Sequence, residues 1–188
     1  MPHIEIDAKL PGILGLLAFR AETAGPLTAL AEALLRGPSP ISAAEREIIA
    51  AHVSRLNQCA FCFKSHAAAA GALLEVGAGI IEQISNETLQ SNCSPKLAAL
   101  LRVATEVQRS GKAVSADTIA AARAAGATDV DVHDTVLIAA AFCMFNRYVD
   151  GLATWAPAAD EAYLEMGELL AAQGYGAAAS ANGATDAG

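Results

Sequence analysis

Apolar segments follow one another along this sequence, and short stretches rich in glycine, proline and serine separate them. Helix signals stand at several of these boundaries. Ser42 and Glu45 form a capping-box signature, and Ser94 followed by Pro95 supplies an N-cap and a proline at the first helical position. The pattern predicts helices over residues 13–22, 27–35, 42–57, 59–76, 96–109, 115–126, 129–154 and 157–173.

The two ends of the chain depart from this pattern. Residues 1–10 look extended up to Pro11, and the residues from Gly174 onward are dominated by small types with no periodic apolar face. No linker and no internal repeat divides the remainder. We therefore expect an N-terminal arm and short helix over 1–24, one helical domain over 25–173 and a disordered tail over 174–188.

The composition supports an all-α fold. Hydrophobic residues make up 54% of the chain, much of it alanine, and aromatic residues make up only 5%. A core of alanine, leucine and isoleucine favours packed helices over sheets. Because each alanine buries little apolar area, we also expect oligomerisation to cover a second set of apolar faces.

Charge and hydropathy bear on the kind of partner. The net charge is −8, and no cluster of Lys and Arg stands out that would neutralise a row of phosphates. The apolar stretches are interrupted well short of the roughly 20 residues that would span a bilayer. The N-terminus shows no basic region followed by an apolar one. We expect a cytoplasmic protein that binds neither nucleic acid nor membrane.

Four cysteines occur, at Cys59, Cys62, Cys93 and Cys143. In a chain of this length without an evident secretory signal, four thiols do not make a disulfide framework. Cys93 resembles a loop residue before an N-cap, and Cys143 resembles a small residue of the core. The close pair is the candidate for metal binding or catalysis.

Cys59, Cys62 and His66 fall on one stripe of the predicted helix, because residues three, four and seven apart share a face. Cys59 stands at the helix N-terminus, where free N–H groups and the macrodipole are expected to lower a thiol pKa. A C-x-x-C pair also lets one sulfur attack while the other resolves. His66 has the right chemistry to accept and donate the protons.

A carboxylate on the preceding helix is a further candidate. Glu47 lies twelve residues before Cys59, so a tight antiparallel helical hairpin would let it face the thiols or His66. There it would orient the imidazole and raise its basicity. His52 lies on a different face of the same helix, and we expect it to stay outside the site.

Two polar residues, Asn146 and Arg147, interrupt an apolar run in the long helix predicted over 129–154. Arg147 either pairs with an acidic group across a subunit contact or is a surface charge. His133, in the first turns of the same helix, reads as structural.

Metal binding is an alternative for the same constellation. A structural zinc site needs four ligands, and Cys59, Cys62 and His66 would supply three of them. Cys93 or Cys143 would have to be the fourth, although neither belongs to a second C-x-x-C pair. The redox interpretation is therefore preferred.

The spacing of these residues resembles the AhpD-like (alkylhydroperoxidase D-like) branch of the carboxymuconolactone decarboxylase family, and is most similar to its peroxidase-related subgroup. The signature reads Glu47, eleven residues, Cys59-x-x-Cys62, three residues, His66. Other segments typical of the family are Asn57-Gln58, residues 67–70 and residues 145–152. The resemblance covers about residues 25–155 and implies a single-domain AhpD-like orthogonal helical bundle.

The resemblance implies a thiol-dependent peroxidase that reduces hydroperoxides, with no bound cofactor or metal. By position, Cys62 meets the peroxide, Cys59 resolves the product, and Glu47 with His66 forms the proton relay. The founding peroxidases carry a histidine before the second cysteine, where this chain has Phe61. The implied electron donor is a lipoyl group or a thioredoxin-like protein, and the implied assembly is a homo-trimer or homo-hexamer. The alternatives are a non-redox enzyme resembling the family's decarboxylases and a metal-binding helical module.

Overall fold

The computed structural model describes residues 1–76, 79–86 and 93–176. Over these ranges the regular structure is helical and no strand is present, which confirms the predicted all-α class. The elements are α1 (Ile13–Phe19), α2 (Ala21–Leu35), α3 (Ala43–Leu56), α4 (Ala60–Leu73), α5 (Gly79–Ser85), α7 (Pro95–Arg109), the 3₁₀ helix η1 (Gly111–Ala113), α8 (Ala116–Ala124), α9 (Asp129–Gly151) and α10 (Glu161–Gln173).

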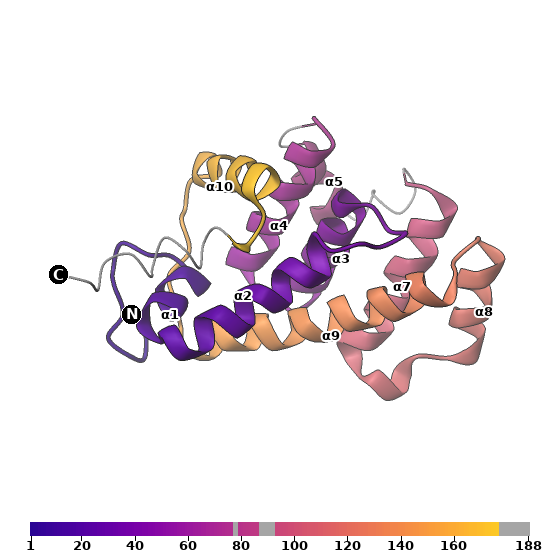
Figure 1. Ribbon diagram of the computed structural model, residues 1–188, viewed down its shortest axis with the longest axis horizontal. Coiled ribbons are helices and arrows are strands. Elements are labelled where there is room, and N and C mark those ends of the chain that lie inside the picture. Colours follow the sequence, from indigo (N-terminus) through magenta and orange to yellow (C-terminus); the bar gives the residue numbers. More distant parts are fainter. Residues whose placement is uncertain (77–78, 87–92, 177–188) are drawn as a thin grey trace.

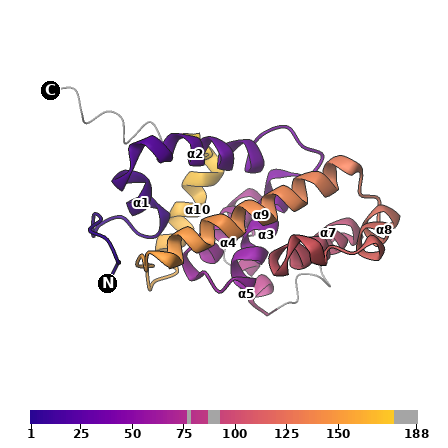
Figure 2. The ribbon, with the colours of Figure 1, turned by 90° about the horizontal axis from the view of Figure 1, so that it is seen from below.

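The longest helix, α9, runs along the long axis of the molecule, and α4 crosses it steeply (Figure 1). Helix α3 packs against α4, α7 and α9 and so lies at the centre of the bundle. Helix α10 packs on α4, and α2 lies along α9 at the opposite side from α7 (Figure 2). The main core forms where these helices meet, and its fully buried members include Ile49, Leu100, Leu101 and Ile138.

The capping signals of the sequence fix where several helices begin. Ser42 and Glu45 form the predicted capping box at the start of α3, and the Ser94 hydroxyl accepts from the backbone N–H of Leu97 at 3.1 Å. Thr128 and Asp131 form a second capping box at the start of α9. Because these side chains satisfy N–H groups that a helix leaves unpaired, each boundary is set locally.

The first two helices differ from the prediction, which separated them at Gly25-Pro26. The chain breaks at Arg20 instead, and α2 begins at Ala21 with Pro26 inside it. The proline removes one hydrogen bond to the carbonyl of Glu22. Glycine at position 25 has no Cβ to clash with the proline ring, so the helix continues through this dipeptide.

The other differences concern boundaries and one missed element. Helix α4 ends at Leu73, before the predicted position 76, and α9 ends at Gly151, before the predicted position 154. The short helix α5 was not predicted, because its seven residues carry neither an N-cap signal nor enough length for a periodic face. The sequence pattern also starts α10 too early, at 157, whereas it begins at Glu161.

The contact between α4 and α10 depends on a glycine. A Cβ built at Gly167 would lie 2.5 Å from the backbone carbon of Ala68 and 2.8 Å from its Cβ. We expect Gly167→Ala to reduce the free energy of unfolding by about 1–3 kcal/mol, because overpacking against backbone forces the helices apart. Urea denaturation measures the change. Gly151→Ala is the control, since a Cβ there meets nothing within 4 Å, and an equal loss in both variants would contradict this packing argument.

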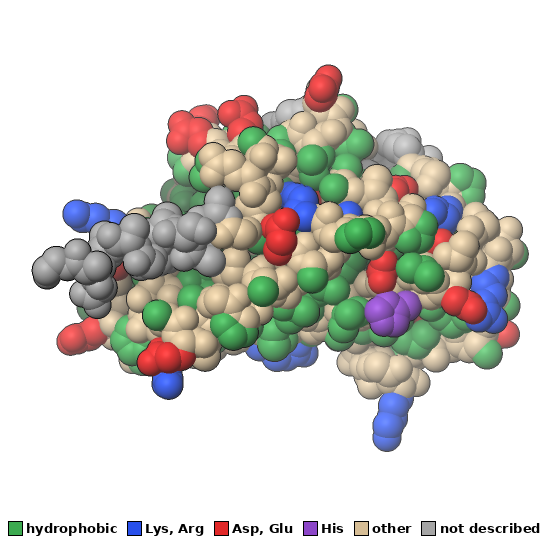
Figure 3. Space-filling model, in the orientation of Figure 1, with side chains coloured by type: hydrophobic (Ala, Val, Ile, Leu, Met, Phe, Trp, Pro, Cys, Tyr) green, Lys and Arg blue, Asp and Glu red, His purple; other side chains and the backbone are tan. Residues whose placement is uncertain are grey.

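Apolar and charged side chains share the surface. On the face shown in Figure 3, basic side chains are scattered singly among apolar and acidic ones. Val130, Leu137 and Met144 form an exposed apolar stripe along α9 at seven-residue spacing, with 52%, 40% and 44% of each residue exposed. No helix in the described part of the chain is long and apolar enough to cross a bilayer.

Candidate active site

A sharp turn between α3 and α4 brings the sequence motif together. Gln58 adopts a left-handed conformation, with φ of 63°, and the backbone N–H of Cys59 donates to the carbonyl of Ser54 at 3.0 Å. A non-glycine residue in this region stores strain, which packed surroundings must hold in place. The turn makes α3 and α4 an antiparallel hairpin, as the Glu47 hypothesis required.

A partly buried network of side-chain amides holds that turn. Asn57 donates to the side-chain oxygen of Asn146 on α9 at 2.8 Å and accepts from Gln108 on α7 at 2.9 Å. Asn146 in turn donates to the hydroxyl of Ser54 at 3.0 Å. This pairing explains why a polar residue interrupts the apolar run of α9: a buried amide is tolerated when its hydrogen bonds are satisfied.

Glu47 is the centre of a second buried network. Its carboxylate is fully buried, and Oε2 lies 2.7 Å from Nδ1 of His66 on α4. The other oxygen, Oε1, lies 2.7 Å from Nη2 of Arg36, which follows α2, and accepts from the hydroxyl of Tyr175 at 2.7 Å. Residues from three parts of the chain therefore meet on one carboxylate, and the Glu47–His66 contact is the one that the hairpin hypothesis anticipated.

The pKa values reflect this arrangement. Burial opposes ionisation of Glu47, but the charge and hydrogen bond of His66, the charge of Arg36 and the hydrogen bond of Tyr175 outweigh it, so the pKa of Glu47 is lowered. Burial and the neighbouring charge of Glu47 raise the pKa of Tyr175 well above its ordinary value. Tyr175 is therefore a phenol that donates, and Glu47 is an anion that accepts.

The two thiols of the motif are both reduced and both buried, with 0% of Cys59 and 3% of Cys62 exposed. We expected the helix N-terminus to lower the pKa of Cys59, and this expectation is wrong. The hydrogen bond with the Cys62 side chain, and then burial, raise the pKa of the Cys59 thiol. Cys59 is the N-cap of α4, whereas Cys62 lies within the first turn of the helix.

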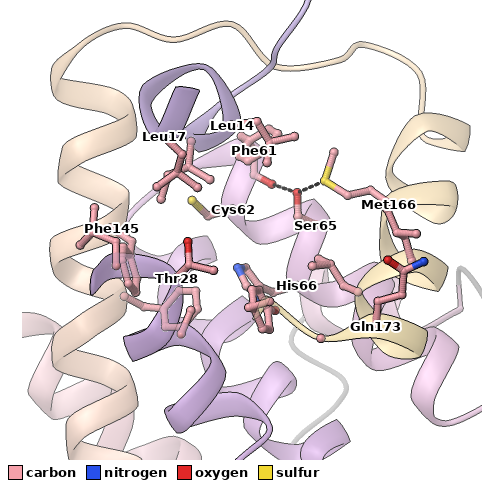
Figure 4. A pocket seen from close by; sticks show the side chains of 18 residues that line it. Leu14, Leu17, Thr28, Phe61, Cys62, Ser65, His66, Phe145, Met166 and Gln173 are labelled. Atoms are coloured by element: carbon pink, nitrogen blue, oxygen red, sulfur yellow. Dashed lines mark hydrogen bonds between the residues drawn. The ribbon is translucent and has the colours of Figure 1, made fainter. Parts of the chain in front are cut away.

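A cavity of about 260 Å³ opens onto this motif. Cys62 and His66 line it from α4, and they face the same space in Figure 4, whereas Cys59 is not part of its wall. Most of the remaining wall is apolar and comes from four other helices, with Ile13, Leu14, Leu17, Leu27, Phe142, Phe145, Met166, Leu169 and Leu170. A small apolar molecule that enters this cavity meets one thiol, that of Cys62, and one imidazole, that of His66.

The residue before the second cysteine, Phe61, is part of the same wall. It is 4% exposed, and its ring centroid lies 6.2 Å from that of Tyr163 on α10. The chain passes close over this ring at Gly12, where φ is 54° and an added Cβ would lie 2.2 Å from a ring carbon. Phe61 therefore contributes shape and apolar surface where a histidine would contribute a proton-carrying group.

Several candidates lie away from this cavity. Nε2 of His52 lies 2.8 Å from the hydroxyl of Thr105 on α7, and His133 is an exposed neighbour of Asp134. Arg147 is also exposed and donates to the carbonyl of Cys143.

The remaining cysteines are not part of the cavity wall either. Cys93 packs beside the main core, and Cys143 lies 3.6 Å from the side-chain nitrogen of Asn57. Within the described residues, no group of three or more His, Cys, Asp and Glu side chains is placed to hold a metal ion.

Sequence reasoning missed Arg36 and Tyr175. Arg36 carries no motif, and only its position just before Gly37-Pro38 marks the end of a helix. Tyr175 falls in the segment that we expected to be disordered, but the structure places residues 174–176 against the site. The sequence offered one signal for Tyr175, since it is a single large aromatic residue in a run of small residues. The rest of the predicted tail, residues 177–188, lies outside the described residues.

Comparison with known proteins agrees with this geometry. Residues 21–106, which include the whole motif from Glu47 to His66, match the carboxymuconolactone decarboxylase family. An uncharacterized peroxidase-related protein from Silicibacter sp. TM1040 is 27% identical, with a TM-score of 0.72 over 82% of this chain and 78% of that one. An uncharacterized peroxidase-related protein from Ralstonia eutropha JMP134, described as an alkylhydroperoxidase AhpD core, is 26% identical. Its TM-score is 0.73 over 84% of this chain and 81% of that one. No curated protein matches the sequence significantly.

Proposed function

We propose that this chain, which belongs to the AhpD-like branch of the carboxymuconolactone decarboxylase family, is a thiol-dependent peroxidase that reduces hydroperoxides. The observation that carries the proposal is the pairing of Cys62 with His66 in one cavity while His66 is held by the buried carboxylate of Glu47. The nearby Cys59 supplies the second thiol that a disulfide cycle needs. The peroxidase-related names of the two similar structures point the same way.

In the first step, the Cys62 sulfur attacks the outer oxygen of the hydroperoxide and the O–O bond breaks. Cys62 becomes a sulfenic acid and the substrate leaves as an alcohol, or as water if it is hydrogen peroxide. His66 takes the thiol proton and returns it to the departing oxygen, and Glu47 stabilises the charge that the imidazole gains. The raised pKa of Cys59 suits a thiol that stays protonated during this step.

In the second step, the Cys59 sulfur attacks the sulfenic sulfur of Cys62. A disulfide forms between the two cysteines, and the hydroxyl of the sulfenic acid leaves as water with the proton of the Cys59 thiol. An external dithiol then returns both sulfurs to the reduced state and becomes a disulfide itself. We propose a lipoyl group or a thioredoxin-like protein as this donor.

The surroundings of the catalytic unit are also proposals. The exposed stripe of Val130, Leu137 and Met144 supports assembly into a homo-trimer or homo-hexamer, since such a stripe suits helix pairing between copies. The net charge of −8 fits a cytoplasmic protein that does not bind nucleic acids.

One equivalent of an organic hydroperoxide should lower the mass of the reduced protein by about 2 Da, because two thiol hydrogens leave when a disulfide forms. Peptide mapping should place the link between Cys59 and Cys62. The matched control is Cys93→Ser with Cys143→Ser, which removes the other two thiols and should leave the mass loss intact. An unchanged mass would contradict the dithiol cycle and favour a non-redox enzyme of the same family. A link that involves Cys93 or Cys143 would contradict the pairing of Cys59 with Cys62.

A further inference from the structure

The chain turns back sharply after α10 and places a tyrosine on the candidate relay. Gly174 adopts a left-handed conformation, with φ of 66°, which lets the following residue point back into the bundle. The Glu32 carboxylate on α2 anchors the turn, because its Oε2 accepts from the backbone N–H groups of Tyr175 at 2.6 Å and Gly176 at 3.2 Å. An added Cβ at Gly174 would lie 2.6 Å from that same oxygen.

The Tyr175 side chain then contacts three members of the site. Its ring stacks on that of His66, with centroids 6.0 Å apart and 17° between the planes, and the Arg36 guanidinium lies 5.2 Å from its centroid. Its hydroxyl lies 2.7 Å from Oε1 of Glu47 and 3.1 Å from Nδ1 of His66. A residue that only filled space would not need a hydroxyl at this point.

Counting donors and acceptors assigns a direction to each hydrogen bond. The ionised Glu47 is an acceptor only, so the Tyr175 hydroxyl donates its one proton to Oε1. The same hydroxyl can then only accept from Nδ1 of His66, and Nδ1 also faces Oε2 of Glu47. Nδ1 must therefore carry a proton, which leaves Nε2 as the ring atom that can take a proton from the cavity.

We propose that Tyr175 is a positioning residue of the proton relay. This inference rests on the proposed function, because it assigns a task in the same site. The hydroxyl bridges Glu47 and His66, and so holds the imidazole in the tautomer whose free nitrogen is available to Cys62. The segment Gly174–Gly176 is thereby a structural part of the active site.

Several charged and titratable groups surround the Glu47 carboxylate to which the Tyr175 hydroxyl donates. Arg36 from the end of α2 and His66 from α4 contact the carboxylate directly, and Arg46 acts on it from the same helix. Glu32 lies beside the backbone of Tyr175 on the far side. Helix α9 contributes Phe142, whose ring meets His66 edge-on at 4.5 Å.

The test compares Tyr175→Phe with Tyr163→Phe, each of which removes one tyrosine hydroxyl. The Tyr163 hydroxyl donates to the carbonyl of Pro157 at 3.0 Å and touches no member of the relay. The titration of Glu47 is read from its side-chain ¹³C carboxyl resonance, assigned with Glu47→Gln. The reactivity of Cys62 is read from the pH dependence of its alkylation by iodoacetamide in the reduced protein.

We expect the pKa of Glu47 to rise by about one unit in Tyr175→Phe, because the anion loses one of its hydrogen-bond donors. The acid limb of the alkylation profile should move to higher pH by about the same amount, and Tyr163→Phe should leave the Glu47 titration unchanged. The proposal would be overturned if the pKa of Glu47 were the same in Tyr175→Phe as in the wild type. It would also be overturned if the pKa of Glu47 rose while the acid limb of the Cys62 alkylation profile stayed in place. Both readouts are independent of peroxide consumption, so a wild-type protein that consumes no peroxide contradicts the proposed function alone.

Discussion

Cys62→Ser should abolish peroxide consumption, with a loss on the order of 10³-fold or more in the rate constant, because serine is not a nucleophile at neutral pH without strong activation. Cys62 is the cysteine that lines the cavity, whereas Cys59 is not part of the cavity wall and the pKa of its thiol is raised. Stopped-flow mixing of the reduced variant with an organic hydroperoxide measures the loss. Full activity in Cys62→Ser would assign the attacking role to another residue.

Cys59→Ser is the informative partner of this variant. Without a resolving thiol, the first turnover should proceed and then stop, with Cys62 trapped as a sulfenic acid about 16 Da heavier. Cys143→Ser is the matched control, because Cys143 is a half-buried cysteine outside the cavity wall and should keep wild-type rates. If Cys59→Ser turned over repeatedly, resolution would have to come from an external thiol.

The helices that the sequence predicted well are those whose ends carry their own chemistry. The capping box of Ser42 and Glu45 and the N-cap Ser94 act through neighbouring backbone N–H groups, so a local pattern is sufficient to locate them. The path through Gly25-Pro26 is different. Whether that dipeptide ends a helix depends on packing of the surrounding helices, and local rules placed the break in the wrong position.

The residues of the candidate site also fall into two groups, those whose proximity follows from local structure and those that only the packing of helices brings together. Cys59, Cys62 and His66 lie on one short stretch, and Glu47 was within reach because a tight hairpin joins its helix to theirs. Arg36 and Tyr175 come from segments whose distance to Glu47 along the chain is not fixed by any single turn. Their contacts exist only after α2 and α10 have packed, so the sequence carried no spacing that would reveal them.

The expectation about Cys59 failed for a related reason. A helix N-terminus does favour an anion, but the argument treated the thiol as exposed and alone. In the folded protein Cys59 is fully buried and shares a hydrogen bond with Cys62, and these two effects raise its pKa. At this position burial and the neighbouring sulfur therefore outweigh the effect of the helix N-terminus.

Glu47→Ala should reduce the free energy of unfolding by about 3–5 kcal/mol, because it leaves a guanidinium in the interior without its counter-ion. The Arg36 side chain is only 13% exposed, and Nη2 lies 2.7 Å from the lost carboxylate. The pKa of Glu47 is lowered in the folded protein, so its contribution is complete above its ordinary value of 4.5 and disappears as the pH falls through the lowered pKa. Urea denaturation should therefore show a difference in the free energy of unfolding between wild type and variant that is large at pH 7 and smaller in acid.

Arg123→Ala is the control for this prediction. The side chains of Arg123 and Asp129 are 60% and 84% exposed, so their ion pair should contribute less than about 1 kcal/mol to stability. A Glu47→Ala loss as small as the control's would mean that Arg36 finds other partners, and that the buried carboxylate is held for its chemistry with His66 rather than for the stability of the fold.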